Sequence, residues 1–201
     1  MGLGVAPVRL TKASGKDVLL VQRFDREKSA DGWARRAMVS ALTMLGLSEM
    51  QARYASYVEL VQIVPRELFA RMVFNILEGN TDDHTRNHAA FWDGARLELT
   101  HAYDICPQAR TGREANQAMA VLGEDRRSLL ENCRLAASSF LLTDAEARDI
   151  INGQASGILA AWVGICDEAE LSEVDRSYLW RQQMLNDYAF EGYIDAPPAG
   201  L

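Results

Sequence analysis

The stretch GNTDDHTRNHAAFWDG, residues 79–94, decides how the rest of the chain is interpreted. Between Asn80 and Asp93 it holds three aspartates, two asparagines, two histidines and an arginine. These side chains bind metals and exchange protons, and they are gathered at one junction between two predicted elements.

The element before this stretch is a predicted helix. Apolar side chains repeat at i, i+1, i+4, i+5, i+8 and i+9, which gives one broad apolar stripe on a helix that Gly79 ends; they are Leu68, Phe69, Met72, Val73, Ile76 and Leu77. The element after it is a predicted hairpin, because Asp93-Gly94 separates the short strand-like runs 89–92 and 96–100. Tyr103-Asp104 follows that hairpin directly.

The remaining sequence predicts one more hairpin and several helices. Residues 5–10 and 18–21 favour two strands around the turn Ser14-Gly15-Lys16-Asp17. Helices are expected over 33–45, 54–63 and 124–140, then from the capping-box residue Thr143, around Trp162, and from about Ser172. The predicted fold class is therefore mainly α with two small β-hairpins.

Composition excludes several classes of protein. The 201 residues are 48% hydrophobic and carry a net charge of -7, so they can form a core and have no overall attraction for nucleic acid or anionic membrane. No apolar run reaches the roughly 18–20 residues of a membrane span, and MGLGVAPVRL lacks the features of a signal peptide. Cys106, Cys133 and Cys166 have no metal-binding spacing, so we expect reduced, buried thiols in a cytoplasmic protein.

The spacing of Asp82 and Asn87 is that of a protein-kinase catalytic loop, D-x-x-x-x-N. In such a loop the aspartate takes the proton of the acceptor hydroxyl and the asparagine holds Mg²⁺. A second Mg²⁺ ligand, an aspartate, comes just after a short hairpin, and Asp104 has that place here. The spacing alone is common by chance, but the order of apolar helix, loop, hairpin and Tyr-Asp is specific.

With these motifs the chain resembles the HipA-like serine/threonine kinases, the toxins of HipA/HipB-type toxin–antitoxin modules. The residues that carry the resemblance are 80–87, 99–104, Val18 to Arg26 and Ala145 to Ile151, and the likeness covers nearly all of residues 3–165. It implies a protein-kinase-like C-lobe that uses ATP and Mg²⁺ to phosphorylate a protein hydroxyl.

The resemblance also implies roles for single residues. Asp82 is similar to the catalytic aspartate, His84 to a catalytic-loop histidine near the nucleotide, and Asn87 and Asp104 to the Mg²⁺ ligands. Gln22, Arg23, Phe24 and Asp25 match the hinge, whose backbone bonds adenine while the phenylalanine packs on it. His101 departs from the family, which usually has proline there.

The same resemblance indicates that most of an N-lobe is missing. The phosphate-binding lysine and its glutamate have no counterparts, since Lys12 and Lys16 are expected in the turn between the first two strands. We therefore expect residues 1–26 to be a remnant of the N-lobe strands plus the hinge, 27–195 the helical C-lobe, and 196–201 a frayed tail. By resemblance the partner is a HipB-like helix-turn-helix antitoxin, which would contact DNA for the complex.

Simpler interpretations stay open beside these. The chain could be an inactive, truncated or split kinase fold that binds a partner, and Asn80, Asp82 and Asp83 could be ordinary turn residues. His84 and His88 have zinc-helix spacing but no third ligand, His101 suits a hairpin surface, and Arg126-Arg127 a solvated helix face. Trp33, Trp162 and Trp180 are expected in the core, and Trp92 over the hairpin.

Overall fold

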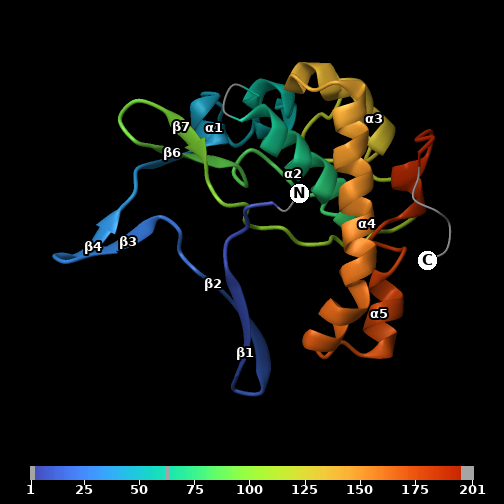
Figure 1. Ribbon diagram of the computed structural model, residues 1–201, viewed down its shortest axis with the longest axis horizontal. Coiled ribbons are helices and arrows are strands. Elements are labelled where there is room, and N and C mark those ends of the chain that lie inside the picture. Colours follow the sequence, from blue (N-terminus) through green and yellow to red (C-terminus); the bar gives the residue numbers. More distant parts are fainter. Residues whose placement is uncertain (1–2, 62–63, 196–201) are drawn as a thin grey trace.

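The computed structural model describes residues 3–61 and 64–195, and Figure 1 shows a helical body from which two hairpins project. Seven strands lie in the described residues: β1 Val8–Ala13, β2 Lys16–Val21, β3 Arg26–Ser29, β4 Gly32–Arg35, β5 Met38–Ser40, β6 Ala89–Trp92 and β7 Leu97–Leu99. The α-helices are α1 Ala41–Met44, α2 Pro65–Glu78, α3 Leu130–Ala136, α4 Asp144–Glu168 and α5 Glu173–Leu179. Short 3-10 turns cover Ala52–Tyr54, Val58–Leu60, Ala137–Phe140 and Asp187–Phe190.

The helix α2 is the centre of the core, as its apolar stripe predicts. Pro65 opens the helix, where its missing N–H costs nothing. Gly79 ends it in the left-handed conformation with φ 82°, which glycine adopts without strain. Phe69 of α2 packs edge-on against Phe140, with ring centroids 5.4 Å apart, and α3 and α4 cover the helix.

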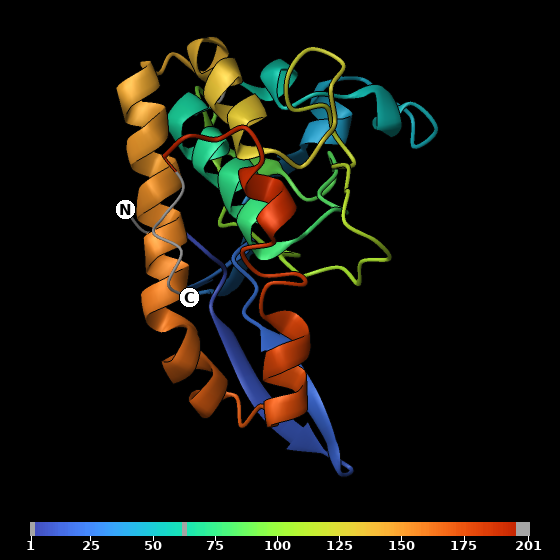
Figure 2. The same ribbon diagram turned by 90° about the vertical axis from the view of Figure 1, so that its right-hand side faces the viewer.

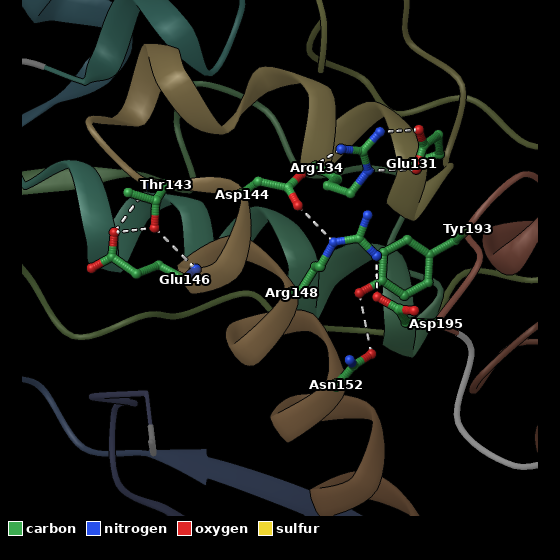
Figure 3. Close-up of polar contacts among 9 residues, drawn as sticks. All are labelled: Glu131, Arg134, Thr143, Asp144, Glu146, Arg148, Asn152, Tyr193 and Asp195. Atoms are coloured by element: carbon green, nitrogen blue, oxygen red, sulfur yellow. Dashed lines mark hydrogen bonds and ion pairs between the residues drawn. The ribbon is translucent and has the colours of Figure 1, made fainter.

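A chain of ion pairs fastens α3 and α4 to the C-terminal segment (Figure 3). Arg134 of α3 binds Glu131 and Asp144, and Arg148 of α4 binds Asp144 at 2.7 Å and also Asp195. In the same view, the capping box predicted at Thr143 is present, with Glu146 bonded to Thr143 in both directions. α4 therefore begins at a fixed point beside the core.

The antiparallel sheet β5–β6–β7 holds the opening stretch in place. Ser40 pairs with Ala89 and Ala90 pairs with Leu99, so the predicted hairpin is confirmed and gains a third strand. Residues 80–88 therefore run from the end of α2 to the start of β6, with both ends of the segment in buried structure.

The helix expected over 33–45 is wrong. Gly32, with φ 120°, lies at the turn between the paired strands β3 and β4, and β5 pairs with β6. Within 33–45, the helical part is therefore α1. Pairing with Phe91 and its neighbours overrides the helix propensity of this segment. Trp33, expected in the core, lies on the projecting β3–β4 hairpin and is 70% exposed.

Other helices are shorter or longer than expected. The helix over 54–63 is replaced by two 3-10 turns, because the Ala55 carbonyl and the Tyr57 N–H bond to the main chain of Ala120 instead. Residues 62–63 lie outside the described part. The segment 124–140 becomes helical only from Leu130, and α5 stops at Leu179. Two expected helices, one after Thr143 and one around Trp162, are a single helix α4.

The first predicted hairpin is confirmed, but it makes few contacts with the helical body. β1 and β2 pair only with each other, with Val8 opposite Val21 and Leu10 opposite Leu19. These four side chains share one face and are 51–61% exposed. Lys12 and Lys16 lie within the strands instead of the turn, and Lys12 is 3.9 Å from Glu170.

The tryptophans and cysteines divide between surface and interior. Trp162 and Trp180 are half-buried and stack with centroids 4.9 Å apart, whereas Trp92 is 48% exposed. Cys133 and Cys166 are buried as expected, but the expectation is wrong for Cys106, which is exposed. All three cysteines are free thiols. The predicted frayed tail, 196–201, lies outside the described residues.

Candidate active site

The two adjacent aspartates of the loop have opposite environments. Asp82 is exposed, whereas Asp83 is 2% exposed. Among the described residues, the Asp82 carboxylate takes part in no hydrogen bond or ion pair, and its contact is through the main-chain N–H. Asp82, which the D-x-x-x-x-N spacing selects, is therefore the solvent-accessible residue of the two.

Asp83 is the anchor of the loop. Its Oδ2 atom accepts hydrogen bonds from Tyr57 Oη, from Asn75 Nδ2 at 2.7 Å, and lies 2.9 Å from His88 Nε2. Burial, and then the charge of Asp83, raises the pKa of Tyr57 well above its ordinary value, so the phenol keeps its proton and donates. Three separate segments thus meet at one carboxylate oxygen.

Asn80 connects the loop to the segment that carries Asp104. Its Oδ1 accepts from the Asp82 N–H at 3.2 Å. Its Nδ2 donates to Asn75 Oδ1 at 3.1 Å and to the Asp104 carbonyl at 3.4 Å. Because Asn80 is 1% exposed, these bonds form away from solvent. Asp82 and Asp104 lie in separate segments of the sequence, and the Asn80 side chain bonds to the main chain of both.

Asp104 sits in an unusual backbone conformation. Its φ is 58°, in the left-handed region that few residues other than glycine, asparagine and aspartate adopt. The residue is exposed, and within the described chain its carboxylate makes no hydrogen bond or ion pair. Next to it, Tyr103 Oη donates to the Arg86 carbonyl at 2.5 Å, which ties this segment to the loop a second time.

Asn87, the other predicted metal ligand, is 6% exposed and lines a small internal cavity of about 10 Å³. Asp83, His88, Arg71 and Tyr103 line the same cavity. Across the described residues, no three His, Cys, Asp or Glu side chains gather as a metal site. Mg²⁺ differs from such metals, because it is commonly held by one or two carboxylates together with nucleotide phosphates and water. The oxygen donors of Asn87 and Asp104 fit that pattern.

The four predicted hinge residues line one pocket. Gln22, Arg23, Phe24 and Asp25 surround an open hollow of about 310 Å³, together with Val21, Met38 and Tyr103. Tyr103 thus connects this pocket with the Asp104 segment. The hinge and the acidic loop, far apart in the sequence, are brought to neighbouring positions.

Three of the hinge side chains, Arg23, Phe24 and Asp25, are already occupied by protein contacts. Phe24 is half-buried, 5.6 Å from the Tyr103 ring and 5.8 Å from the His101 ring, measured between centroids. Asp25 is held by two nitrogens of Arg23, Nη2 at 2.6 Å and Nε at 2.8 Å, and these bonds lower the pKa of its carboxyl. Phe24 and Asp25 both line the hollow while they make these contacts.

His84 and His101 lie in different environments. His84 is half-buried, and its buried Nδ1 atom has no hydrogen-bond partner in the described structure. His101 is exposed, as expected for a hairpin surface, and its ring lies against Phe24. The zinc alternative for His84 and His88 gains no third ligand among the described residues.

Sequence reasoning missed the residues that support the loop. Tyr57, Asn75 and His88 serve Asp83, and nothing in their spacing predicts that they converge. A usable signal was Asn75, a polar residue next to the apolar stripe of α2. Glu78 was also missed. It is 3% exposed, and burial, with the nearby Asp83 charge, raises its pKa to about 8.

The fold that brings the pocket at residues 22–25 close to the acidic loop 80–88 has a solved counterpart. The structure is similar to HipA of Shewanella oneidensis MR-1, solved in complex with HipB and operator DNA, with a TM-score of 0.73 at 20% identity. The superposition covers 88% of this chain and 49% of that chain, and it shows a shared fold.

The model of the HipA-like C-terminal domain matches residues 1–162, and the chain therefore belongs to that family. A curated relative is the "Putative kinase Y4mE" of Sinorhizobium fredii (strain NBRC 101917 / NGR234), 27% identical over 120 residues. That alignment covers 52% of this chain and 29% of Y4mE. The chain spans less than half the length of either relative. No helix in the described ranges has both the length and the apolarity of a bilayer crossing.

Proposed function

We propose that this chain carries the catalytic half of a HipA-like, ATP-dependent serine/threonine protein kinase, the toxin component of a toxin–antitoxin module. The observation that supports this most is that Asp82 and Asp104 have exposed carboxylates without a partner in the described chain, and that the buried amide of Asn80 bonds to the main chain of both residues. Carboxylates that no other described residue binds, on a main chain held by buried hydrogen bonds, are available to a substrate and a cation.

In this proposal Asp82 orients the acceptor hydroxyl and takes its proton as the phosphoryl group moves. Asn87 and Asp104 would hold Mg²⁺, which neutralises charge on the phosphates when it is bound. The role of the chain is mostly positioning, since phosphoryl transfer depends on alignment and electrostatics. His84, half-buried in the same loop, would face the nucleotide side.

The hollow at Gln22 to Asp25 would receive adenine. Its volume of about 310 Å³ suits a flat heterocycle, and hinge backbone groups are the usual partners of such a ring. The Phe24 ring offers an apolar wall at the edge of the hollow. We propose ATP as the nucleotide on the ground of family membership.

The partner proposed is a HipB-like helix-turn-helix antitoxin. The HipA structure that this fold resembles is a complex with HipB and operator DNA. With a net charge of -7, this chain is poorly suited to neutralise DNA phosphates by itself. The antitoxin would therefore make most contacts with DNA, and the kinase would phosphorylate a protein substrate in the cytoplasm.

A second candidate function has its own support. The exposed apolar face of β1–β2, formed by Val8, Leu10, Leu19 and Val21, stands out from the body without a covering element in the described structure. Exposed apolar patches of this kind mark interaction sites. The chain would then be an inactive partner-binding module, or would become active when another polypeptide supplies phosphate-binding elements.

The test is the thermal stability of the full chain with and without Mg-ATP, repeated for Asp104→Ala. A ligand at 100 times its Kd adds roughly 2.7 kcal/mol to the folded state. The kinase proposal predicts a shift of several degrees that requires Mg²⁺ and vanishes in the variant. No shift at millimolar nucleotide would favour the binding-module function, and mixing with a candidate partner would be the next step.

A further inference from the structure

Asp83 and His88 occupy matching positions in the loop. Asp83 directly follows the proposed proton acceptor Asp82, and His88 directly follows the proposed Mg²⁺ ligand Asn87. The side chains of Asp83 and His88 meet at 2.9 Å, although the residues are five positions apart. Because neighbouring Cα atoms are about 3.8 Å apart, fixing residues 83 and 88 also restricts residues 82 and 87.

The contact is anchored to three other parts of the fold. Tyr57 and Asn75 bond the same Asp83 oxygen, which attaches the loop to the 56–60 segment and to α2. The His88 carbonyl accepts from the Ala41 N–H at 2.8 Å, which attaches it to α1. The loop between them is closed by its own bond from Asn87 N–H to the His84 carbonyl, also 2.8 Å.

A purely structural role would not explain why the fold bears the free-energy cost of burying the polar side chains of Asp83 and His88. Asp83 and His88 are 2% and 3% exposed, and no lysine or arginine in the described chain forms an ion pair with Asp83. Burying a carboxyl group is unfavourable unless its hydrogen bonds are complete, and an apolar residue would fill the space more cheaply. What this pair provides, and an apolar pair could not, is a directional link between the two ends of the loop.

We infer that the Asp83–His88 pair is a clamp that sets the separation between Asp82 and Asn87. Both are positioning residues, since their side chains are buried, and the inference rests on the proposed phosphoryl-transfer site. The clamp predicts that the loop loosens locally when the contact is removed, before the rest of the molecule does.

The experiment is amide hydrogen exchange of the full, nucleotide-free chain, comparing wild type, His88→Leu and His88→Gln. Glutamine places an amide Nε2 near the position of the imidazole Nε2, so it can restore the link that leucine removes. We expect amides of residues 81–87 to exchange at least tenfold faster in His88→Leu, with α4 unchanged, and near-normal exchange in His88→Gln. Equal exchange of the loop in all three proteins, or a uniform rise across the molecule, would overturn the clamp.

A second pair of variants guards against loss of folding. Tyr57→Phe removes the hydroxyl that donates to the Asp83 oxygen of the clamp, and Tyr193→Phe removes a hydroxyl that bonds Asn152 at 3.2 Å, far from the loop in the sequence. Only Tyr57→Phe should raise loop exchange, and equal effects would count against the clamp. If wild type binds Mg-nucleotide, His88→Leu should also need severalfold more Mg²⁺ for half-maximal stabilisation. An absent response in wild type counts against the proposed kinase alone, because the exchange result does not depend on it.

Discussion

Asn80 donates a hydrogen bond from Nδ2 to the main-chain carbonyl of Asp104, 3.4 Å away, while its Oδ1 accepts from the N–H of Asp82. One side chain therefore sets the relation between the proposed proton acceptor and a proposed Mg²⁺ ligand. Both ends of the amide are used, and no other amino acid of this size offers a donor and an acceptor in that arrangement.

Replacing Asn80 should damage the site more than the fold. Asn80→Ala leaves the Asp82 N–H and the Asp104 carbonyl without this partner, and we expect a loss of about 1–3 kcal/mol in the free energy of unfolding. We also expect the stabilisation by Mg-ATP to disappear, as measured by thermal unfolding. Asn186→Ala is the matched control, because Asn186 bonds three backbone groups elsewhere. That variant should lose stability and keep its response to Mg-ATP, and a lost response there would contradict the specific role of Asn80.

Glu78 should make stability fall as the pH rises. Its pKa is about 8 in the folded protein against an ordinary value of 4.5, so between these values the folded state holds a proton that the unfolded state has released. The contribution is complete below about pH 4.5 and is lost as the pH rises through 8. Each pKa unit corresponds to about 1.4 kcal/mol, so the decline is about 5 kcal/mol at most.

The measurement is urea unfolding at pH 5.5, 7 and 8.5 for wild type and Glu78→Gln. Glutamine cannot ionise, so the variant should show a flatter profile and exceed wild type at the highest pH. Parallel profiles for the two proteins would show that Glu78 does not titrate in this range.

Two glycine-to-alanine changes should act in opposite directions. At Gly79 the φ is 82°, and an added Cβ would lie 2.8 Å from the Gln183 carbonyl oxygen. We expect Gly79→Ala to lower the free energy of unfolding by more than about 2 kcal/mol, from backbone strain and the clash. Gly157 lies inside α4 with open space around it. Gly157→Ala should therefore stabilise by roughly 0.5–1 kcal/mol, and chemical denaturation of both variants checks the signs.

The apolar face of β1–β2 should matter for association and little for folding. Leu10→Thr with Leu19→Thr changes two cross-strand neighbours that are 52% and 60% exposed. We expect the free energy of unfolding to change by no more than about 0.5 kcal/mol per site. Binding to any partner that covers this face should weaken at least tenfold, measured by titration calorimetry with the candidate antitoxin or N-lobe polypeptide. Val163→Thr on α4, 63% exposed, is the control and should bind normally.

The parts of the fold that the sequence predicts well are those with local signals. The stripe of α2, its Gly79 end, the Thr143 capping box and the Asp93-Gly94 hairpin are all encoded within a few neighbouring residues. The helix expected over 33–45 failed because its fate depends on β6, about 50 residues further along the chain. Trp33 was assigned to the core from its apolar character alone, although it sits on a projecting hairpin.

The site residues likewise fall into those that local sequence patterns predict and those that depend on the packing of distant segments. Spacing selected Asp82, Asn87 and Asp104, and the structure adds why Asp82, and not Asp83, is accessible. The convergence of Tyr57, Asn75 and His88 on Asp83 could not be predicted, because it results from the packing of three separate segments. The roles of Asp82, His84, Asn87, Asp104 and the hinge residues remain predictions, and Asp104→Ala in the Mg-ATP stability test addresses one of them directly.

The unbroken course of α4 has a structural consequence. At 1.5 Å per residue, its 25 residues form a rod of about 37 Å. At the N-terminal end of α4, Asp144 forms an ion pair with Arg134 of α3 (Figure 3). At the C-terminal end, Glu168 lines a hollow together with Leu10 and Asp17 of the first hairpin. Both views of the molecule show the rod running alongside the body toward that hairpin (Figures 1 and 2). α4 therefore connects the ion-paired part of the core with the outer half of the first hairpin through one continuous helix.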